Sequence, residues 1–140
     1  MSVASAIGVA GGHPLGDVHP LRGCTRLELA TVQECATAMW IEPGAVVWNA
    51  GELAREAVIV IEGELEAHIG GLPLGAVRAG QALGVPLALS GRGRWPYSVS
   101  AVEPTYALVI STRELQRLVF DVPDLLLRLV DDAPALFEVS

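Results

Sequence analysis

Glycine and proline interrupt the middle of this chain at short intervals, from Trp40 to Ile110. Between these breaks lie short runs rich in β-forming residues: "TAMWI", "AVVWN", "AVIVIEG", "ELEAHIG", "LPLGAVR", "YSVSAV" and "TYALVI". Short strands separated by regular turn signals are typical of a β-sandwich or barrel. The sequence therefore predicts a mainly β fold with seven or eight strands.

The run at 64–69 has the clearest strand period. Leu65, Ala67 and Ile69 alternate with polar residues, so we expect these three side chains in the core and Glu64, Glu66 and His68 facing out. The pairs "EG" at 62–63 and "GG" at 70–71 are interpreted as two-residue hairpin turns, since Gly accepts the positive φ that such turns need. Three consecutive antiparallel strands are expected from these turns.

Helical patterns flank the strand region. Thr-x-x-Glu at 25–28 and Ser-x-x-Glu at 111–114 are capping boxes, each at the start of a predicted helix. In the first helix, of about three turns, one stripe is expected to hold Leu27, Ala30, Cys35, Ala38 and Met39. A third helix is expected from Pro123, with Leu125, Leu126, Leu129 and Val130 facing inward.

Length and composition favour one domain with an apolar surface. A chain of 140 residues suits a single core, predicted over 22–132, with an irregular arm at 1–21 and a tail at 133–140. The chain is 51% hydrophobic with only 18% charged residues, and its mean hydropathy is +0.46. Such a surface is expected to meet a protein partner or a second copy, so a homodimer is predicted.

Charge, hydrophobic run length and cysteine spacing argue against several classes of protein. The net charge of −7 argues against direct nucleic-acid binding, which needs a basic face. No apolar run approaches the ~20 residues of a membrane span. No basic residue precedes Arg22, so a secretory signal is not expected. On a helix, Cys24 and Cys35 would lie roughly 16 Å apart, too far for a disulfide, and reduced thiols in a cytoplasmic protein are predicted.

Two segments carry a resemblance to a known family. "IEPGAVVWNAGELAREAVIVIEGELEA" at 41–67 and "AGQALG" at 79–84 are similar to cyclic-nucleotide-binding domains of the catabolite-activator type. The shared features are a Pro-Gly turn, a Gly-Glu turn, a V-I-x-x-G-x-x-E pattern and the glycines that enter the phosphate-binding cassette. The resemblance covers about 20–132 and implies a double-stranded β-helix, or jelly roll, of about eight strands with flanking N- and C-terminal helices.

The cassette itself departs from the family pattern. In the family, a Glu that holds the ribose follows the Gly, and ten residues later an Arg and then a Ser or Thr contact the cyclic phosphate. By this spacing, Val85 stands at the Glu position, Trp95 at the Arg position and Pro96 at the Ser or Thr position. The candidate ligand pocket is thus a degenerate one, formed by Gly84, Val85, Pro86, Leu87, Arg94, Trp95 and Pro96.

Three interpretations of this pocket stay open. Val85, Leu87 and Trp95 could fill it, which would leave a regulatory or interaction module that does not bind cyclic nucleotides in the usual way. A neutral or aromatic small ligand could stack on Trp95. Alternatively, Arg94 or Arg92 could replace the missing cation, and the domain would be a genuine cyclic-nucleotide sensor.

The remaining candidate metal-binding, catalytic and aromatic residues give weaker evidence of a function. A cupin-like metal enzyme needs inward-facing histidines, but His13 and His19 lie in the arm and His68 is predicted to face outward, so neither a metal nor another cofactor is expected. No nucleophile motif is present, and an enzyme is not expected. Trp40 and Trp48 are expected in core or sheet-edge packing, with a partner surface as the second interpretation. The residues after Pro123 are expected to leave no room for a DNA-reading domain.

Overall fold

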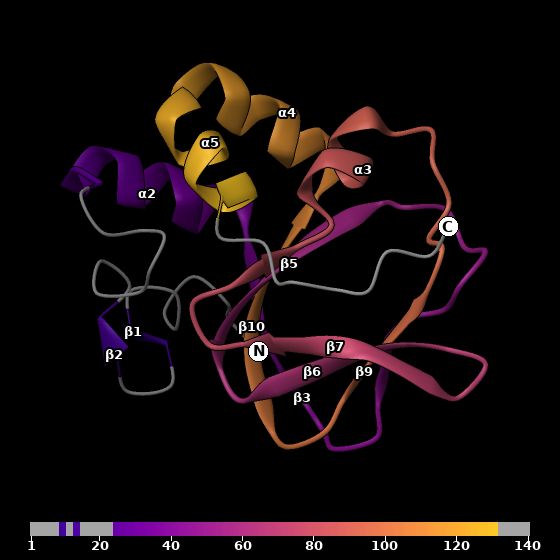
Figure 1. Ribbon diagram of the computed structural model, residues 1–140. Helices are drawn as coiled ribbons and strands as arrows, with labels where there is room; N and C mark the ends of the chain where they lie inside the picture. Colours follow the sequence, from indigo (N-terminus) through magenta and orange to yellow (C-terminus); the bar gives the residue numbers. More distant parts are fainter. Residues whose placement is uncertain (1–8, 11–12, 15–23, 132–140) are drawn as a thin grey trace.

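The computed structural model describes residues 9–10, 13–14 and 24–131, and eight strands of this part form two antiparallel four-stranded sheets (Figure 1). One sheet has the order β3-β10-β5-β8, from strands Thr37–Ile41, Thr105–Ser111, Glu56–Glu62 and Ala82–Leu83. The other has the order β4-β9-β6-β7, from strands Val46–Trp48, Ser98–Ala101, Glu64–Ile69 and Leu72–Arg78. The predicted mainly β jelly roll of about eight strands with flanking helices is confirmed.

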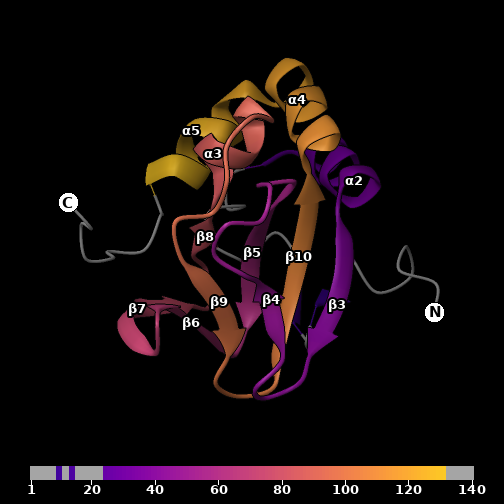
Figure 2. The same cartoon turned by 90° about the vertical axis from the view of Figure 1, so that its right-hand side faces the viewer.

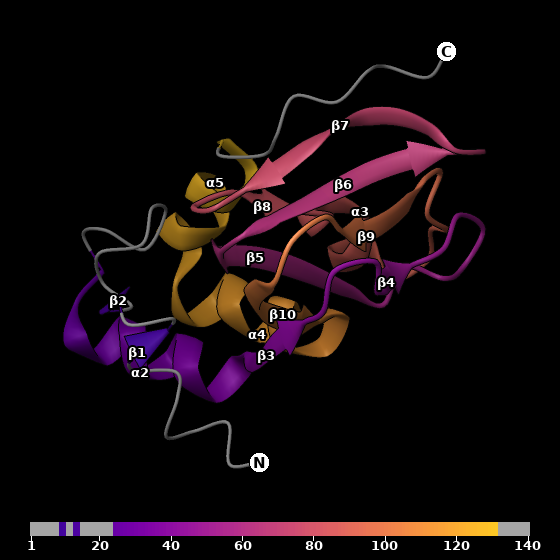
Figure 3. The same ribbon diagram turned by 90° about the horizontal axis from the view of Figure 1, so that it is seen from below.

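The helices of the described residues gather at one end of the roll (Figure 2). They are α2 (Arg26–Cys35), α3 (Val85–Ser90), α4 (Thr112–Asp121) and α5 (Pro123–Asp131). Seen from below, the β6–β7 hairpin lies on the side of the molecule away from α2 (Figure 3). Within the predicted irregular arm, β1 (Val9–Ala10) and β2 (His13–Pro14) form a short antiparallel ladder.

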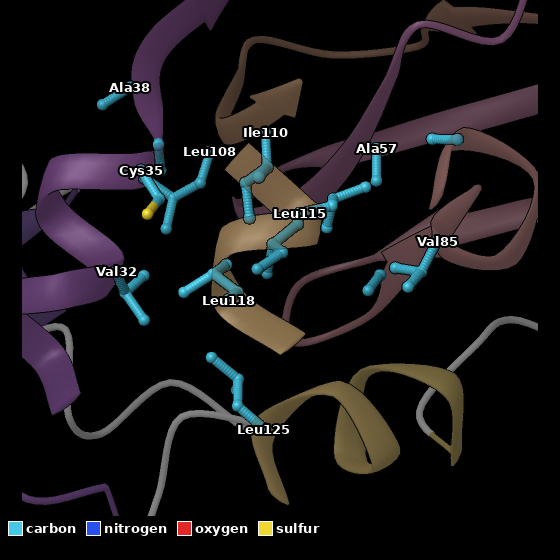
Figure 4. Packing of buried hydrophobic residues seen from close by; sticks show 14 of the residues in the cluster. Val32, Cys35, Ala38, Ala57, Val85, Leu108, Ile110, Leu115, Leu118 and Leu125 are labelled. Atoms are coloured by element: carbon cyan, nitrogen blue, oxygen red, sulfur yellow. The ribbon is translucent and has the colours of Figure 1, made fainter. Parts of the chain in front are cut away.

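Alternation along the central strands divides the core into two clusters. Leu108 and Ile110 of β10 face the helices and pack with residues such as Leu115 and Leu118 of α4 (Figure 4). Between them in the sequence, Val109 faces the other sheet. The first group is called the helix-side cluster and the second the inter-sheet cluster. Because a strand's side chains alternate between faces, one central strand serves both.

Helix α2 begins as predicted but ends early. Its capping box is complete: the Glu28 amide donates to Thr25 Oγ1 at 3.1 Å, and the Thr25 amide donates to Glu28 Oε1 at 2.8 Å. The predicted stripe was wrong, since Leu27 is 79% exposed and Met39 lies in β3. Residues 37–41 pair with β10 along their whole length, and this sheet pairing ends the helix at Cys35.

The turn at Gly63 is a corner and not a hairpin. Strand β5 ends at Glu62 and β6 begins at Glu64, yet the two strands belong to different sheets. Gly63 has φ +96°, and a Cβ at this position would approach the Thr105 Cα to 2.7 Å. The expectation of three consecutive antiparallel strands was therefore wrong, because β6 pairs with β7 and β9. The predicted hairpin at 70–71 is confirmed by the pairing of Ile69 with Leu72.

The helices after the roll follow the sequence pattern closely. Ser111 caps α4 and accepts a hydrogen bond from the Glu114 amide at 3.3 Å, while the Glu114 carboxylate lies 3.9 Å from Arg117. Leu125 of α5 is fully buried, as predicted. The predictions for Leu126, Leu129 and Val130 concern side chains outside the described ones, as does the prediction of a tail at 133–140.

Both cysteines are free thiols, and their lack of a disulfide agrees with the prediction. Burial, followed by a hydrogen bond with Glu114, raises the pKa of Cys35 to about 11, so this thiol stays protonated near neutral pH. Among the helices that the structure describes, none has the length and apolar character needed to span a membrane.

Candidate functional site

The candidate pocket lies where β8 runs into α3 and the chain returns through residues 91–97 to β9. Gly84 occupies the junction in the left-handed region, with φ +86°. A Cβ at Gly84 would come within 2.5 Å of Trp95 Cη2 and 3.3 Å of Trp48 Cη2. Glycine is required here for two reasons, its positive φ and the close approach of two indoles.

Two tryptophans stack beside Gly84. The rings of Trp48, from β4, and Trp95, from the loop before β9, have centroids 3.8 Å apart and planes inclined by only 4°. Each residue is 3% exposed. Tyr97 lies at the edge of this group, 6.4 Å from Trp95, and burial raises the pKa of its hydroxyl. The space next to the cassette glycine is therefore occupied by aromatic rings. None of these three side chains carries a permanent charge.

The Trp48 indole nitrogen is buried and has no hydrogen-bond partner among the described residues. An unpaired buried donor costs about 1 to 3 kcal/mol of stability. Packing of the two rings therefore has to offset the cost of leaving the Trp48 N–H without a hydrogen bond.

The other predicted pocket residues separate into two groups. Leu87 packs with Trp95 in the inter-sheet cluster, and its Cγ lies 2.9 Å from where a Cβ on Gly93 would be. Val85 is also buried, but in the helix-side cluster (Figure 4), so it does not line the same space as Trp95. Pro86 and Pro96 are exposed. The first turn of α3 directs its apolar side chains to both clusters, which the linear spacing alone does not indicate.

Arg94 lies on the surface and has a backbone partner. Its Nη1 donates to the Gly51 carbonyl at 2.8 Å. Trp95, the next residue, is buried, while its amide donates to the Glu52 carbonyl at 2.9 Å. The two neighbouring side chains thus lie on opposite sides of this segment, as strand geometry predicts. Arg92 is exposed and, in the described part of the chain, makes no side-chain hydrogen bond or ion pair.

The histidines do not form a cluster in the described region. His68 Nε2 lies 3.2 Å from Ser100 Oγ on the neighbouring strand. Among the residues that the structure describes, no group of three His, Cys, Asp or Glu side chains could hold a metal ion. The side chains of His13 and His19 are outside the described ones.

Sequence reasoning missed the partner of Trp95. Trp48 was expected in core or sheet-edge packing, and it is buried, but its stacking on Trp95 depends on the pairing of β4 with β9. The signal in the sequence was an aromatic residue at the end of a strand that the resemblance places near the cassette. Trp40 is 52% exposed on β3, an edge strand, and its ring lies 4.9 Å from that of Tyr106.

Comparisons with known proteins agree with this architecture. Residues 38–121 match the family model of the cyclic nucleotide-binding domain. Among solved structures, the catabolite activator protein of Thermus thermophilus is similar, with a TM-score of 0.66, 21% identity, and coverage of 79% of this chain and 53% of that one. The N-terminal domain of a transcriptional regulator from Streptomyces coelicolor A3(2) has a TM-score of 0.64 and 16% identity, with 79% and 81% covered. A search of curated protein sequences finds no match.

Proposed function

The chain belongs to the cyclic nucleotide-binding domain family, a family of regulatory modules, and we propose that it acts as an interaction module that does not bind cyclic nucleotides in the usual way. The observation that carries the proposal is the Trp48–Trp95 stack beside Gly84. Trp95 stands where the family resemblance implies a phosphate-binding Arg. An indole offers no charge to a phosphate, and this one is already packed against a second ring.

The energetic argument has two parts. Removing the charged partner of a buried ion costs on the order of 2 to 5 kcal/mol, which moves a micromolar site to the high micromolar or millimolar range. Admitting a nucleotide base would also separate the rings, and a stacked aromatic pair contributes about 0.5 to 1.5 kcal/mol beyond its burial. Both terms weaken binding.

The alternative is a genuine sensor that uses Arg94 or Arg92. Arg94 would have to leave the Gly51 carbonyl and cross to the side of the segment that Trp95 occupies. A neutral ligand stacking on Trp95 would have to displace Trp48. These rearrangements make both alternatives the weaker proposals, and both predict measurable ligand binding.

The proposed role is binding and not catalysis. The free thiols fit a cytoplasmic location. The net charge of −7 disfavours nucleic acid as a direct partner. Exposed apolar side chains such as Phe120 and Leu127, on α4 and α5, support a protein partner or a second copy of the chain.

Calorimetric titration with cyclic AMP and cyclic GMP tests the pocket. We expect no heat of binding up to about 1 mM ligand. Micromolar binding by the unmodified protein would overturn the proposal. Arg94→Gln and Arg92→Gln are the matched variants, since loss of such binding in one of them would identify the cation and establish the sensor.

For the interaction role, light scattering and cross-linking should show a dimer or a copurifying protein, and a monomer without a partner would contradict it.

A further inference from the structure

A second space between the two sheets remains open, at the side where β3 and β4 form their edges. It has a volume of about 450 Å³ and is called the β3–β4 slot. Its walls are mostly apolar and come from the four strands β3, β4, β5 and β10 and from the turn between β3 and β4, with Met39, Ile41, Val46, Val47, Val109 and Glu56 among the lining residues.

The slot is open because it lies at a sheet edge. Strand β3 is the outermost strand of one sheet and β4 of the other, so no further strand of the described residues pairs with their outer edges. Met39 of β3 is 41% exposed and Val46 of β4 is 53% exposed. On the central strand β5, by contrast, Val58 of the inter-sheet cluster is buried. Exposed apolar side chains from two sheets that line one hollow are typical of a binding site.

One carboxylate in the slot lacks a partner. Glu56 begins β5 and lies on the same face of this strand as Val58 and Val60, which face the other sheet. Within the described part of the chain, its side chain makes no hydrogen bond or ion pair. Burial raises the pKa of Glu56, because the half-buried carboxylate has lost part of its hydration. Among the described residues that line the slot, the other charged residue is Glu42, and none is Lys or Arg.

These features define the class of ligand. A hollow of this size suits a small organic molecule. Its apolar walls favour an aromatic or aliphatic body, and its two carboxylates favour a cation and repel an anion. We propose that the β3–β4 slot binds a small organic cation, such as an arylalkyl amine, with the ammonium group at Glu56 and the apolar body against Met39 and Val46.

NMR of methionine methyl groups provides a direct test. The chain has two methionines, Met1 and Met39, so the Met39 signal reports on the slot and the Met1 signal serves as an internal reference. The probes are 2-phenylethylamine, its neutral analogue 2-phenylethanol and the anion 3-phenylpropanoate. We expect the amine to shift the Met39 signal saturably, with a Kd of about 1 mM or tighter, and the other two probes to bind at least about tenfold more weakly.

Variants assign the cation contact. Glu56→Gln keeps the shape of the side chain and removes its charge, and we expect it to weaken the amine about tenfold without changing the binding of the alcohol. Glu103→Gln, on the exposed turn before β10, is the matched control and should leave the titration unchanged. Equal binding of amine and alcohol, unchanged amine binding in Glu56→Gln, or no saturable shift would overturn the proposal. The comparison of the three probes needs no variant, and its outcome is independent of whether the cassette binds cyclic nucleotides.

Discussion

The space between the two sheets ends in two different ways. Beside the cassette, Trp48 and Trp95 fill it and are almost completely buried. At the β3–β4 edge, the lining side chains leave a hollow that contains the Glu56 carboxylate. Both regions use residues of the inter-sheet cluster. The same roll thus closes one site with its own aromatic rings and leaves another open at an edge that no described strand covers.

Truncating the stack should give the largest effect. We expect Trp95→Ala to lower the free energy of unfolding by about 3 to 5 kcal/mol, because it removes a buried ring and leaves a cavity against Trp48. Met39→Ala at the open slot should cost less than about 1 kcal/mol, since that side chain is already 41% exposed. Urea unfolding of both variants measures the contrast. Similar losses at the two positions would contradict it.

A methyl group at Gly84 should test the close approach of the rings. Gly84→Ala is expected to lower the unfolding free energy by about 2 to 3 kcal/mol, from the strained φ and the clash with Trp95. Gly71→Ala is the control, because Gly71 has φ +82° and nothing lies within 4 Å of the place that a methyl group would occupy there. It should cost about 1 kcal/mol. If both variants lose the same stability, the indoles adjust freely and the cassette is less closed than we infer.

Replacing Trp48 by Phe should separate packing from polarity. Trp48→Phe keeps an aromatic ring against Trp95 and removes the unpaired indole N–H. The smaller ring buries less apolar area, which destabilises the fold, whereas removal of the unpaired N–H stabilises it. We therefore expect the free energy of unfolding to change by no more than about 1 kcal/mol. Thermal unfolding at constant pH measures it. A loss well above that value would indicate that the N–H has a partner, such as a bound water.

The smallest expected effect concerns pH at the slot. Burial raises the pKa of folded Glu56 above the unfolded value of 4.5, so the folded state binds the proton more tightly. Stability from this residue is therefore present below pH 4.5 and is lost as the pH rises through the folded pKa. Glu56→Gln should be more stable than the unmodified protein by about 0.3 kcal/mol at about pH 7, after allowance for solvent screening, and by nothing at about pH 4. The reverse order at neutral pH would show that the carboxylate has a stabilising cation.

The sequence predicts local features well and long-range pairing less well. The capping box at Thr25 and the hairpin at Gly70 depend on adjacent residues, and both are confirmed. Gly63 was misinterpreted because a positive φ suits a hairpin and a sheet corner equally. Only its contact with Thr105, forty-two positions later in the chain, distinguishes them.

The same limit applies to the candidate site. The cassette spacing left burial of Trp95 as one of three open interpretations, and its partner Trp48 comes from a strand far away in the sequence. Val85 was assigned to the pocket and lies in the helix-side cluster, since the orientation of the α3 turn is set by its packing on α4 and β5. The β3–β4 slot left one weak signal, the adjacent apolar residues Met39 and Trp40, which break the strand alternation.

The pairing of the outer strands has a consequence for how this domain forms. In the described roll, β3 hydrogen-bonds only with β10, and β4 only with β9. During synthesis, both early strands must therefore wait until residues 98–111 have left the ribosome before either finds its neighbour. Such distant pairings slow folding, because the chain loses the entropy of closing a long loop before the strand contacts contribute any stabilisation. Until then, the apolar residues of both early strands are available to chaperones.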